Sequence, residues 1–268
     1  MFTKNDILNQ LENMNAPTDK VVLMHTSLRA VGNIDGGAKT LLDAMIEYFT
    51  KDGGLFCVPT HTWHNFGKEY VLDMDKTDTA LGAFSDFAAA DPRGLRSEHP
   101  THSMVVFGDR KKAEEFVKDE EFITSYTSPD GCYAKLCSMG GYVLLAGVSH
   151  NRNTYLHAVE EMLNVPDRMY EEPRFFKIRK KSGEVVERKM YVFKCSFISD
   201  ISLRFVKFET AFRYHGCIKD GFVGNAPCQL CDAKGMKSVL ELIYKNSTEK
   251  DPLCDELPIE QRLYCIKD

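Results

Sequence analysis

Residues 142–148 read Tyr-Val-Leu-Leu-Ala-Gly-Val and lie between Gly141 and Ser149. The run is apolar from end to end and shorter than an ordinary helix, which is typical of a strand covered on both faces. Strands of this kind occur in sheets that carry helices on both sides. This stretch therefore predicts an α/β fold built around a buried sheet.

Comparable apolar runs predict further buried strands over residues 21–24, 55–58 and 104–107. Helices are expected between and around them, over residues 3–14, 38–49, 154–163 and 234–245. Thr3 and Asp6 are spaced as a capping pair, and Asn153 or Thr154 can cap the third of these helices. Alternating strands and helices predict one domain, residues 1–268, whose sheet is mainly parallel.

Residues 175–194 have a different pattern. Two mixed runs are separated by residues 180–184, Lys-Lys-Ser-Gly-Glu, which predicts the turn of a β-hairpin. We therefore expect this hairpin as an appendage of the single α/β domain.

Composition excludes several classes of protein. With 43% hydrophobic and 27% charged residues among 268, the chain is neither disordered, collagen-like nor a coiled coil. The net charge of −5 lacks the basic surplus of a nucleic-acid-binding protein. No run reaches the ~18–20 apolar residues of a membrane span, and the N-terminus lacks the apolar core of a signal peptide. The nine scattered cysteines are expected as free thiols, which predicts a cytoplasmic protein without membrane contact.

Seven of the eight histidines fall in four polar segments, residues 25–32, 60–64, 96–103 and 149–161. Three of these segments directly follow predicted strands. In open α/β sheets, ligands bind outside the carboxyl ends of the strands. The four segments are therefore the predicted location of the functional site.

His157 and Glu160 stand three residues apart on a predicted helix and so share one face of it. A carboxylate beside an imidazole fixes its tautomer and stabilises the imidazolium, as a general base requires. A surface ion pair is the alternative, since this spacing is common. Because the helix directly follows a buried strand, its first turn is expected to face the site.

Three other motifs suggest different chemistry. Residues 29–34 resemble the pyrophosphate loop of the large N-acetyltransferase superfamily, but Ile34 stands where that loop has Gly or Ala. Cys228 and Cys231 have the spacing of a zinc knuckle without a second such pair. Cys132 is a candidate acyl-accepting nucleophile, although no His or Asp pattern adjoins it.

The ordered segments together resemble the aminoglycoside 3-N-acetyltransferase family, also called antibiotic N-acetyltransferases. Two motifs carry most of the resemblance: R-S-x-H-P-x-x-S at residues 96–103 and N-T-x-L-H-x-x-E at residues 153–160. The other matching segments are residues 24–32, 36–38, 58–60, 128–129, 147–148 and 224–226.

The resemblance implies a mixed α/β sandwich that transfers acetyl from acetyl-CoA to the 3-amino group of a 2-deoxystreptamine aminoglycoside, which confers antibiotic resistance. His157 is then the catalytic base and Glu160 the carboxylate that orients it, with no metal. Residues implied in binding acetyl-CoA are His25, Thr26, Ser27, Leu28, Arg29, Val31, Gly32, Arg96, Ser97, His99, Thr101 and Ser103. Residues implied in binding the acceptor are Thr60, Trp63, His64, Thr154 and Glu161.

The acceptor remains open at this point. His64 follows Trp63 where many resistance enzymes have an acidic residue, and the hairpin carries Lys177, Arg179, Lys180 and Lys181. The alternatives are an acyltransferase for another amine, a CoA-binding module without turnover, and a metal-dependent hydrolase that uses His61, His64, His99 and His102. The expected partner is a small molecule, and the expected assembly is a monomer or homodimer.

Overall fold

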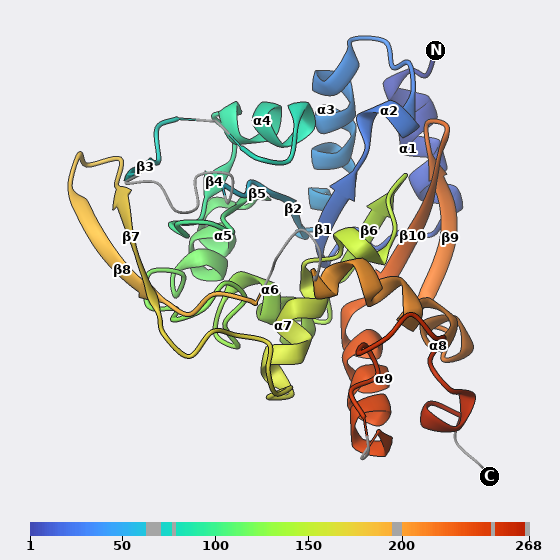
Figure 1. Ribbon diagram of the computed structural model, residues 1–268. Coiled ribbons are helices and arrows are strands. Elements are labelled where there is room, and N and C mark those ends of the chain that lie inside the picture. The colour runs from blue at the N-terminus through green and yellow to red at the C-terminus, as the bar shows by residue number, and fades with distance from the viewer. Residues whose placement is uncertain (63–70, 77–78, 195–199, 248–249, 266–268) are drawn as a thin grey trace.

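The computed structural model describes residues 1–62, 71–76, 79–194, 200–247 and 250–265. Within them, the main sheet has seven strands in the order β4-β5-β2-β1-β6-β10-β9 (Figure 1). The strands are β1 (Val21–Thr26), β2 (Leu55–Pro59), β4 (Leu95–Arg96), β5 (Met104–Gly108), β6 (Tyr142–Ala146), β9 (Ile218–Val223) and β10 (Ala226–Asp232).

The prediction of a mainly parallel sheet is wrong. The central strand β1 pairs in parallel with β2 and with β6, and the other four neighbouring pairs of this described sheet are antiparallel. Two of the antiparallel pairs follow short connections of the chain: residues 97–103 join β4 to β5, and a turn at Gly224, where φ is 59°, joins β9 to β10. The other two, β2 with β5 and β6 with β10, pair strands that are far apart in the sequence. A tight turn can join only antiparallel strands, and no apolar run in the sequence predicted β4, β9 or β10.

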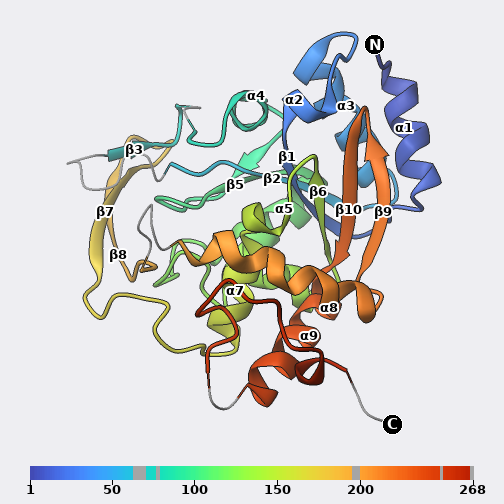
Figure 2. The same cartoon turned by 45° about the vertical axis from the view of Figure 1, so that its right-hand side comes forward.

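Helices cover both faces of the sheet, which confirms the mixed α/β sandwich (Figures 1 and 2). Successive side chains of a strand point to opposite faces, so Val22 and Met24 pack on one side and Val21 and Leu23 on the other. The first side carries α1 (Lys4–Asn13), α2 (Leu28–Val31), α3 (Gly37–Thr50) and α4 (Ala83–Ala90). The second carries α5 (Arg110–Val117), α6 (Cys132–Ser138), α7 (Tyr155–Met162), the 3₁₀ helix η3 (Ile201–Phe208), α8 (Glu209–Tyr214) and α9 (Ala233–Asn246).

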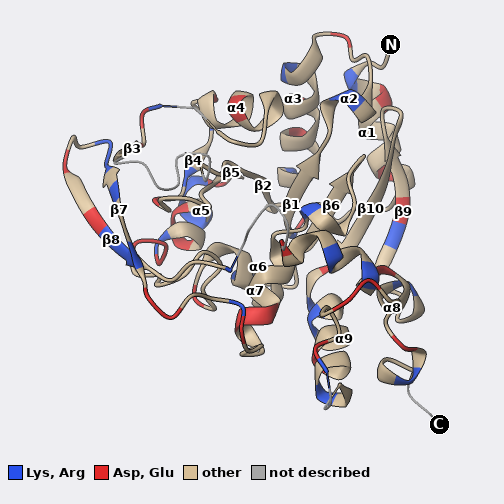
Figure 3. Ribbon diagram, in the orientation of Figure 1, with Lys and Arg blue, Asp and Glu red and all other residues tan. Residues whose placement is uncertain are grey.

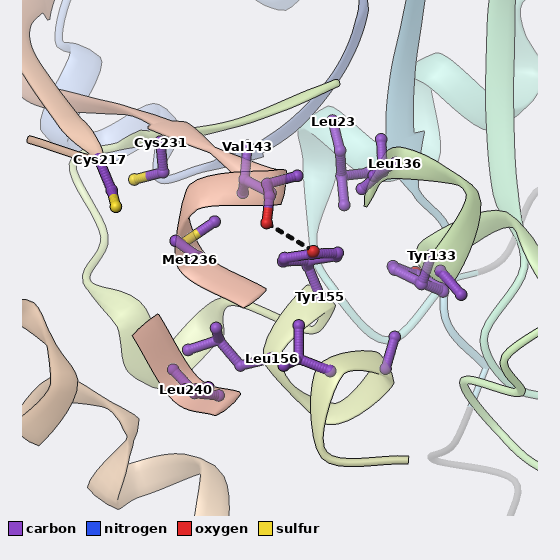
Figure 4. Packing of buried hydrophobic residues seen from close by; sticks show 14 of the residues in the cluster. Leu23, Tyr133, Leu136, Val143, Tyr155, Leu156, Cys217, Cys231, Met236 and Leu240 are labelled. Atoms are coloured by element: carbon purple, nitrogen blue, oxygen red, sulfur yellow. Dashed lines mark hydrogen bonds between the residues drawn. The ribbon is translucent and has the colours of Figure 1, made fainter. Parts of the chain in front are cut away.

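Tyr155 anchors the first turn of α7 in the second core. Figure 4 shows its ring between Leu136 and Met236, close to Val143 of β6. Its hydroxyl donates a 2.7 Å hydrogen bond to the carbonyl of Ala233 at the start of α9. Because α7 is fixed at this point, the orientation of the residues that follow Tyr155 is fixed as well.

The predicted N-terminal side-chain cap is present in α1 and absent in α7. The Asp6 N–H donates to Thr3 Oγ1 at 3.2 Å, and the Thr3 N–H donates to Asp6 Oδ2 at 2.8 Å, which confirms the capping pair of α1. The predicted side-chain cap of α7 is wrong, because Thr154 makes no such bond. Asn153 is instead within 3.2 Å of His150 Nδ1, and a 3₁₀ turn, η2 (His150–Arg152), leads into the helix.

The predicted hairpin is confirmed as β7 (Arg174–Arg179) and β8 (Val185–Met190), and β3 (Val71–Asp73) joins it parallel to β7. Figure 1 shows this smaller sheet at one side of the main sheet, and Figure 3 shows charges of both signs along it. Lys180 Nζ lies 3.4 Å from Glu98 and 3.5 Å from Glu121, and Arg188 lies within 4.0 Å of both. These ion pairs tie the hairpin to the 96–103 loop. Within the described chain, no helix combines the length and apolarity needed to cross a membrane.

Candidate active site

The first two turns of α7 bring His157 and Glu160 together on one buried face. His157 Nδ1 lies 4.0 Å from Glu160 Oε2. Neither atom has a hydrogen-bond partner among the described residues. The separation exceeds a hydrogen bond, as is common at catalytic sites before the substrates bind. The pair is therefore placed so that a small movement would join the two atoms.

Aromatic rings enclose the imidazole of His157. The ring centre of Phe193 lies 4.4 Å from it and that of Phe205 lies 4.8 Å from it. Burial lowers the pKa of His157 below its usual value, Asp200 opposes that effect, and Arg168 adds to it. The imidazole is consequently neutral at pH 7, which is the form that can accept a proton.

Two donors hold the Glu160 carboxylate by its Oε1 atom, the oxygen that is not the one 4.0 Å from His157. Oε1 accepts a 2.8 Å bond from Arg168 Nε and a 2.6 Å bond from the Tyr244 hydroxyl. Burial raises the pKa of Glu160, whereas Arg168 and Tyr244 act in the opposite direction. Oε2 is thus the oxygen that remains for His157.

A group of aromatic and histidine side chains adjoins this pair. The His61 and His102 rings are 4.4 Å apart, and His61 Nε2 lies 2.6 Å from the Tyr133 hydroxyl. Tyr126 stacks on His102 at 4.5 Å. Burial moves the pKa of His61 well below its usual value, and the nearby His25, His99 and His157 contribute to that shift. The structure therefore gathers histidines from all four polar segments, whereas His150 lies apart, against Phe212.

The side chains of the 96–103 loop bond mainly to the protein itself. The buried Arg96 guanidinium donates to Thr60 O at 3.0 Å, to Lys76 O at 2.8 Å and to Ser103 Oγ at 3.1 Å. Ser103 Oγ lies 2.9 Å from Thr60 Oγ1. These contacts give Arg96 and Ser103 a structural role, and their predicted contact with CoA remains a prediction.

The other predicted residues of this loop are also buried. His99 Nδ1 accepts the N–H groups of Thr101 at 3.1 Å and His102 at 2.8 Å. Ser97 Oγ accepts the Met104 N–H at 3.1 Å. Burial lowers the pKa of His99 to about 3, so its ring stays neutral. The loop is therefore preorganised, and its role in binding CoA stays a prediction.

The 25–32 loop turns sharply after β1. Thr26 Oγ1 donates to Ala146 O at 3.3 Å, and the Ala30 N–H lies 3.3 Å from Ser27 Oγ and 2.9 Å from Ser27 O. Gly32 has a φ of 82°, and a Cβ there would lie 2.8 Å from the Asn225 side chain. A larger residue at position 32 would therefore disturb the loop both by strain and by contact.

Exposure differs among the predicted CoA-binding residues of this loop. Val31 is fully buried in the core under α1 and α3, whereas Arg29 is exposed. His25 is buried at the end of β1, and burial lowers its pKa to about 3. Leu28 begins the short helix α2 and is partly buried. Arg29 is thus the cation of this loop that a phosphate can reach.

The predicted acceptor-binding residues are unevenly placed. Trp63 and His64 lie outside the described residues. Thr60 and Thr154 are buried. The Glu161 carboxylate accepts bonds from the hydroxyls of Ser125 and Thr127 and, at 3.1 Å, from the Thr127 N–H. Glu161 thus anchors the segment 125–127, and its contact with the acceptor stays a prediction.

A profile of the family described as aminoglycoside 3-N-acetyltransferase matches residues 23–243. The chain belongs to this family. The SPbeta prophage-derived aminoglycoside N(3')-acetyltransferase-like protein YokD of Bacillus subtilis (strain 168) is 24% identical to this chain. The alignment is 269 positions long and covers 93% of this chain and 94% of YokD.

Solved structures of the aminoglycoside 3-N-acetyltransferase family share the fold. A variant of aminoglycoside acetyltransferase AAC(3)-IVa, in complex with a gentamicin, is 25% identical with a TM-score of 0.74, over 88% of this chain and 86% of that one. The binary structure of AAC-IIIb with CoASH is 21% identical with a TM-score of 0.76, over 93% of this chain and 99% of that one.

The zinc-knuckle reading of Cys228 and Cys231 does not fit this member of the aminoglycoside 3-N-acetyltransferase family. Both lie on β10, three residues apart, and residues at odd spacing on a strand point to opposite faces. Cys228 packs in the core under α1 and α3, and Cys231 packs in the core under α7 and α9. The described residues contain no group of three or more His, Cys, Asp or Glu side chains arranged to hold a metal.

Sequence patterns did not indicate several residues of the candidate site. Arg168, Tyr244, Phe193 and Phe205 contact His157 or Glu160 directly. They come from loops and from helices η3 and α9, outside both family motifs. A short-range motif contains no signal for contacts of this kind.

Proposed function

We propose that this chain transfers acetyl from acetyl-CoA to the 3-amino group of a 2-deoxystreptamine aminoglycoside. The observation that carries the proposal is the buried His157–Glu160 pair in a member of this family: His157 Nδ1 and Glu160 Oε2 lie 4.0 Å apart, and neither has a hydrogen-bond partner in the described part of the chain. The gentamicin complex of AAC(3)-IVa and the CoASH complex of AAC-IIIb support the two substrates.

The proposed reaction needs no covalent enzyme intermediate. The acceptor amine attacks the thioester carbonyl, a C–N bond forms and the C–S bond breaks. The amine proton goes to His157, and the departing thiolate of CoA receives it. Glu160 stabilises the imidazolium while the proton resides there. A general base is typically worth 10²–10⁴-fold, and holding both substrates in one complex contributes further.

The 25–32 loop is the proposed source of donors for the oxyanion. Its Ala30, Val31 and Gly32 N–H groups already bond to the carbonyls of Ser27 and Leu28. The N–H groups of Leu28 and Arg29, at the start of this turn, are the donors that we assign to the oxyanion. Backbone donors fixed before the reaction stabilise a developing oxyanion efficiently.

Acetyl transfer to an amine of different charge is the second candidate function. The acidic side chains that face the hairpin, Glu98 and Glu121, are paired with Lys180 and Arg188. These two carboxylates are therefore less available to a polycationic antibiotic. The enzyme chemistry at His157 would be the same for either acceptor.

A panel of acceptors tests the two candidates. We expect acetyl-CoA-dependent thiol release with kanamycin-, gentamicin- or apramycin-type acceptors, and acetylation at the 3-amino group by mass spectrometry and NMR. Simple amines serve as the comparison, and His157→Ala serves as the control for background thiol release. Turnover with simple amines alone would support the second candidate. Binding of CoA without transfer to any amine would contradict both.

Replacing Cys132 by alanine is expected to leave acetyl transfer close to the wild-type rate. Cys132 Sγ points to the Phe116 carbonyl at 3.6 Å, and burial together with Glu120 raises the thiol pKa well above its usual value. A nucleophilic cysteine needs the thiolate form, which this environment disfavours. The check is the steady-state rate together with mass spectrometry of enzyme quenched during turnover. An acetyl group on Cys132 would contradict the proposed mechanism.

A further inference from the structure

We propose that Arg168 is a positioning residue that holds Glu160 as a carboxylate with Oε2 turned toward His157, and that Asp251 and Tyr244 hold Arg168 in place. The proposal rests on the role proposed above for His157. It adds a support that comes from three segments of the chain: the loop after α7, helix α9 and the segment after α9.

The contacts of Arg168 involve all three nitrogens of its guanidinium. Nε donates to Glu160 Oε1 at 2.8 Å, Nη1 to Asp251 Oδ2 at 2.7 Å, and Nη2 to Asp251 Oδ1 and to the Tyr244 hydroxyl, each at 3.1 Å. The side chain is 8% exposed. A planar fork can bind one carboxylate with two N–H groups and a second carboxylate with Nε, whereas the compact ammonium of lysine cannot.

Glu160 needs a cation to stay ionised. Its side chain has no exposure to solvent, and a buried carboxylate takes up a proton unless a positive charge compensates for the lost hydration. The side chains that face it are Arg168, Tyr244 and His157, with Asp251 just beyond Arg168. Arg168 is the one fixed cation among these described groups, because a guanidinium keeps its proton.

The net charge of the cluster formed by Glu160, Arg168 and Asp251 suits a neighbouring general base, which becomes positively charged when it accepts a proton. One arginine between two carboxylates, Glu160 and Asp251, leaves a net charge of −1. Proton transfer to His157 then brings the buried cluster to neutrality. The other ionisable groups that act on His157 or its neighbouring rings are Asp200, Arg96 and four histidines, His25, His61, His99 and His102. The negative charge of this cluster therefore helps to stabilise the imidazolium that forms when the amine loses its proton.

The same contacts fix which carboxylate oxygen meets the imidazole. Arg168 and Tyr244 both donate to Oε1 of Glu160, and Tyr244 also accepts a bond from Arg168. Oε2 has no partner among the described side chains and lies 4.0 Å from His157 Nδ1. Turning the carboxylate out of this orientation would break its bonds to Arg168 and Tyr244. Arg168 therefore sets the orientation of the Glu160 carboxylate as well as its charge.

Infrared spectroscopy of Arg168→Met tests the charge of Glu160 without any substrate. We expect a protonated-carboxyl band at pH 7 in Arg168→Met that disappears in the Arg168→Met/Glu160→Gln double variant. Subtracting the Glu160→Gln background removes the contribution of the buried Glu120 and Glu161. Wild type should show no such band for Glu160. A Glu160 band in wild type, or none in Arg168→Met, would overturn the proposal.

Kinetics supply the second readout. Arg168→Met and Glu160→Gln are each expected to lower kcat about tenfold, less than loss of the whole base, with each KM within about threefold of wild type. The double variant should lose no more than either single variant, because residues that act as one unit are not additive. Additive losses, or losses confined to KM and thermal stability, would identify Arg168 as merely structural.

Arg213 provides the matched control. It also joins two carboxylates, with 2.9 Å to Glu209 and 2.8 Å to Asp220, but it lies exposed on α8. Arg213→Met is expected to leave the infrared spectrum and kcat unchanged.

If Arg168→Met fails to fold, Tyr244→Phe removes one donor to Glu160 and should make the Glu160 band appear at higher pH than in wild type. Because the infrared result needs no turnover, an inactive acceptor panel would contradict the proposed function and leave this proposal standing.

Discussion

Replacing His157 by alanine is expected to lower kcat roughly 10²–10⁴-fold, the range usual for loss of a general base. The ring is neutral at pH 7 because burial between Phe193 and Phe205 lowers its pKa. Acetyl-CoA binding should change less than about threefold, since the proposed CoA contacts are in other loops. Glu160→Gln should cost less, because the imidazole remains and loses only its charged partner.

The pH dependence separates a missing base from a damaged fold. As the pH rises from 7 to 9, the acceptor amine loses its proton without help, so the His157→Ala defect should shrink. Steady-state rates across this range, with circular dichroism of the variant, are the measurement. His150→Ala is the matched control, because His150 is a buried histidine that lies apart from the cluster, against Phe212. A folded His157→Ala enzyme with near-normal kcat would redirect attention to His25, His99 and His102.

Acid is expected to unfold the protein at a mild pH. Burial lowers the pKa of six described histidines, to about 3 for His25 and His99, to about 4 for His150, and below the usual value for His61, His102 and His157. The unfolded chain takes up protons at these residues as the pH falls below about 6.5, whereas the folded chain does not. The stability that they contribute is therefore present above about pH 6.5 and declines toward pH 4.

The size of this effect is large for one domain. Each net proton taken up on unfolding lowers the unfolding free energy by roughly 1.4 kcal/mol per pH unit. Glu120, Glu160 and Glu161 offset part of it, because burial raises their pKa and they favour the folded state as the pH falls. A few uncompensated protons would still exhaust a typical 5–15 kcal/mol within about two pH units.

Thermal unfolding between pH 7 and 4, followed by circular dichroism, tests this expectation. Tm should fall steeply below about pH 6.5, and calorimetry in buffers of different ionisation enthalpy should show proton uptake on unfolding. His150→Gln should reduce the slope by removing one of the six histidines. A Tm that stays constant from pH 7 to 5 would contradict the prediction.

Local sequence patterns predicted the parts of this fold whose contacts are local. The spacing of Ile7 and Leu11 and the Thr3–Asp6 cap belong to one helix, and the structure has both. The apolar runs at β1, β2, β5 and β6 were recognisable because each is buried on both faces. The direction of strands could not be predicted, since it depends on which edge a returning segment joins.

In the candidate site, too, the contacts between residues close in sequence were predictable and the long-range contacts were not. His157 and Glu160 are three residues apart, so helical periodicity was enough to pair them. The partners of Glu160 come from farther along the chain: Arg168 lies 8 residues after Glu160, and Tyr244 lies 84 residues after it. No periodic pattern connects residues at such separations, and only tertiary packing reveals that they meet.

The position of the Glu160 partners affects how related sequences should be compared. The match to the family profile ends at residue 243, one residue before Tyr244 and well before Asp251. A survey restricted to the matched region would count a homologue as intact even if it lacked both partners. On the proposed role of Arg168, such a homologue would keep both signature motifs and yet have a weaker base. Comparisons of resistance enzymes with homologues that lack the activity should therefore extend beyond the matched region, to the positions of Tyr244 and Asp251.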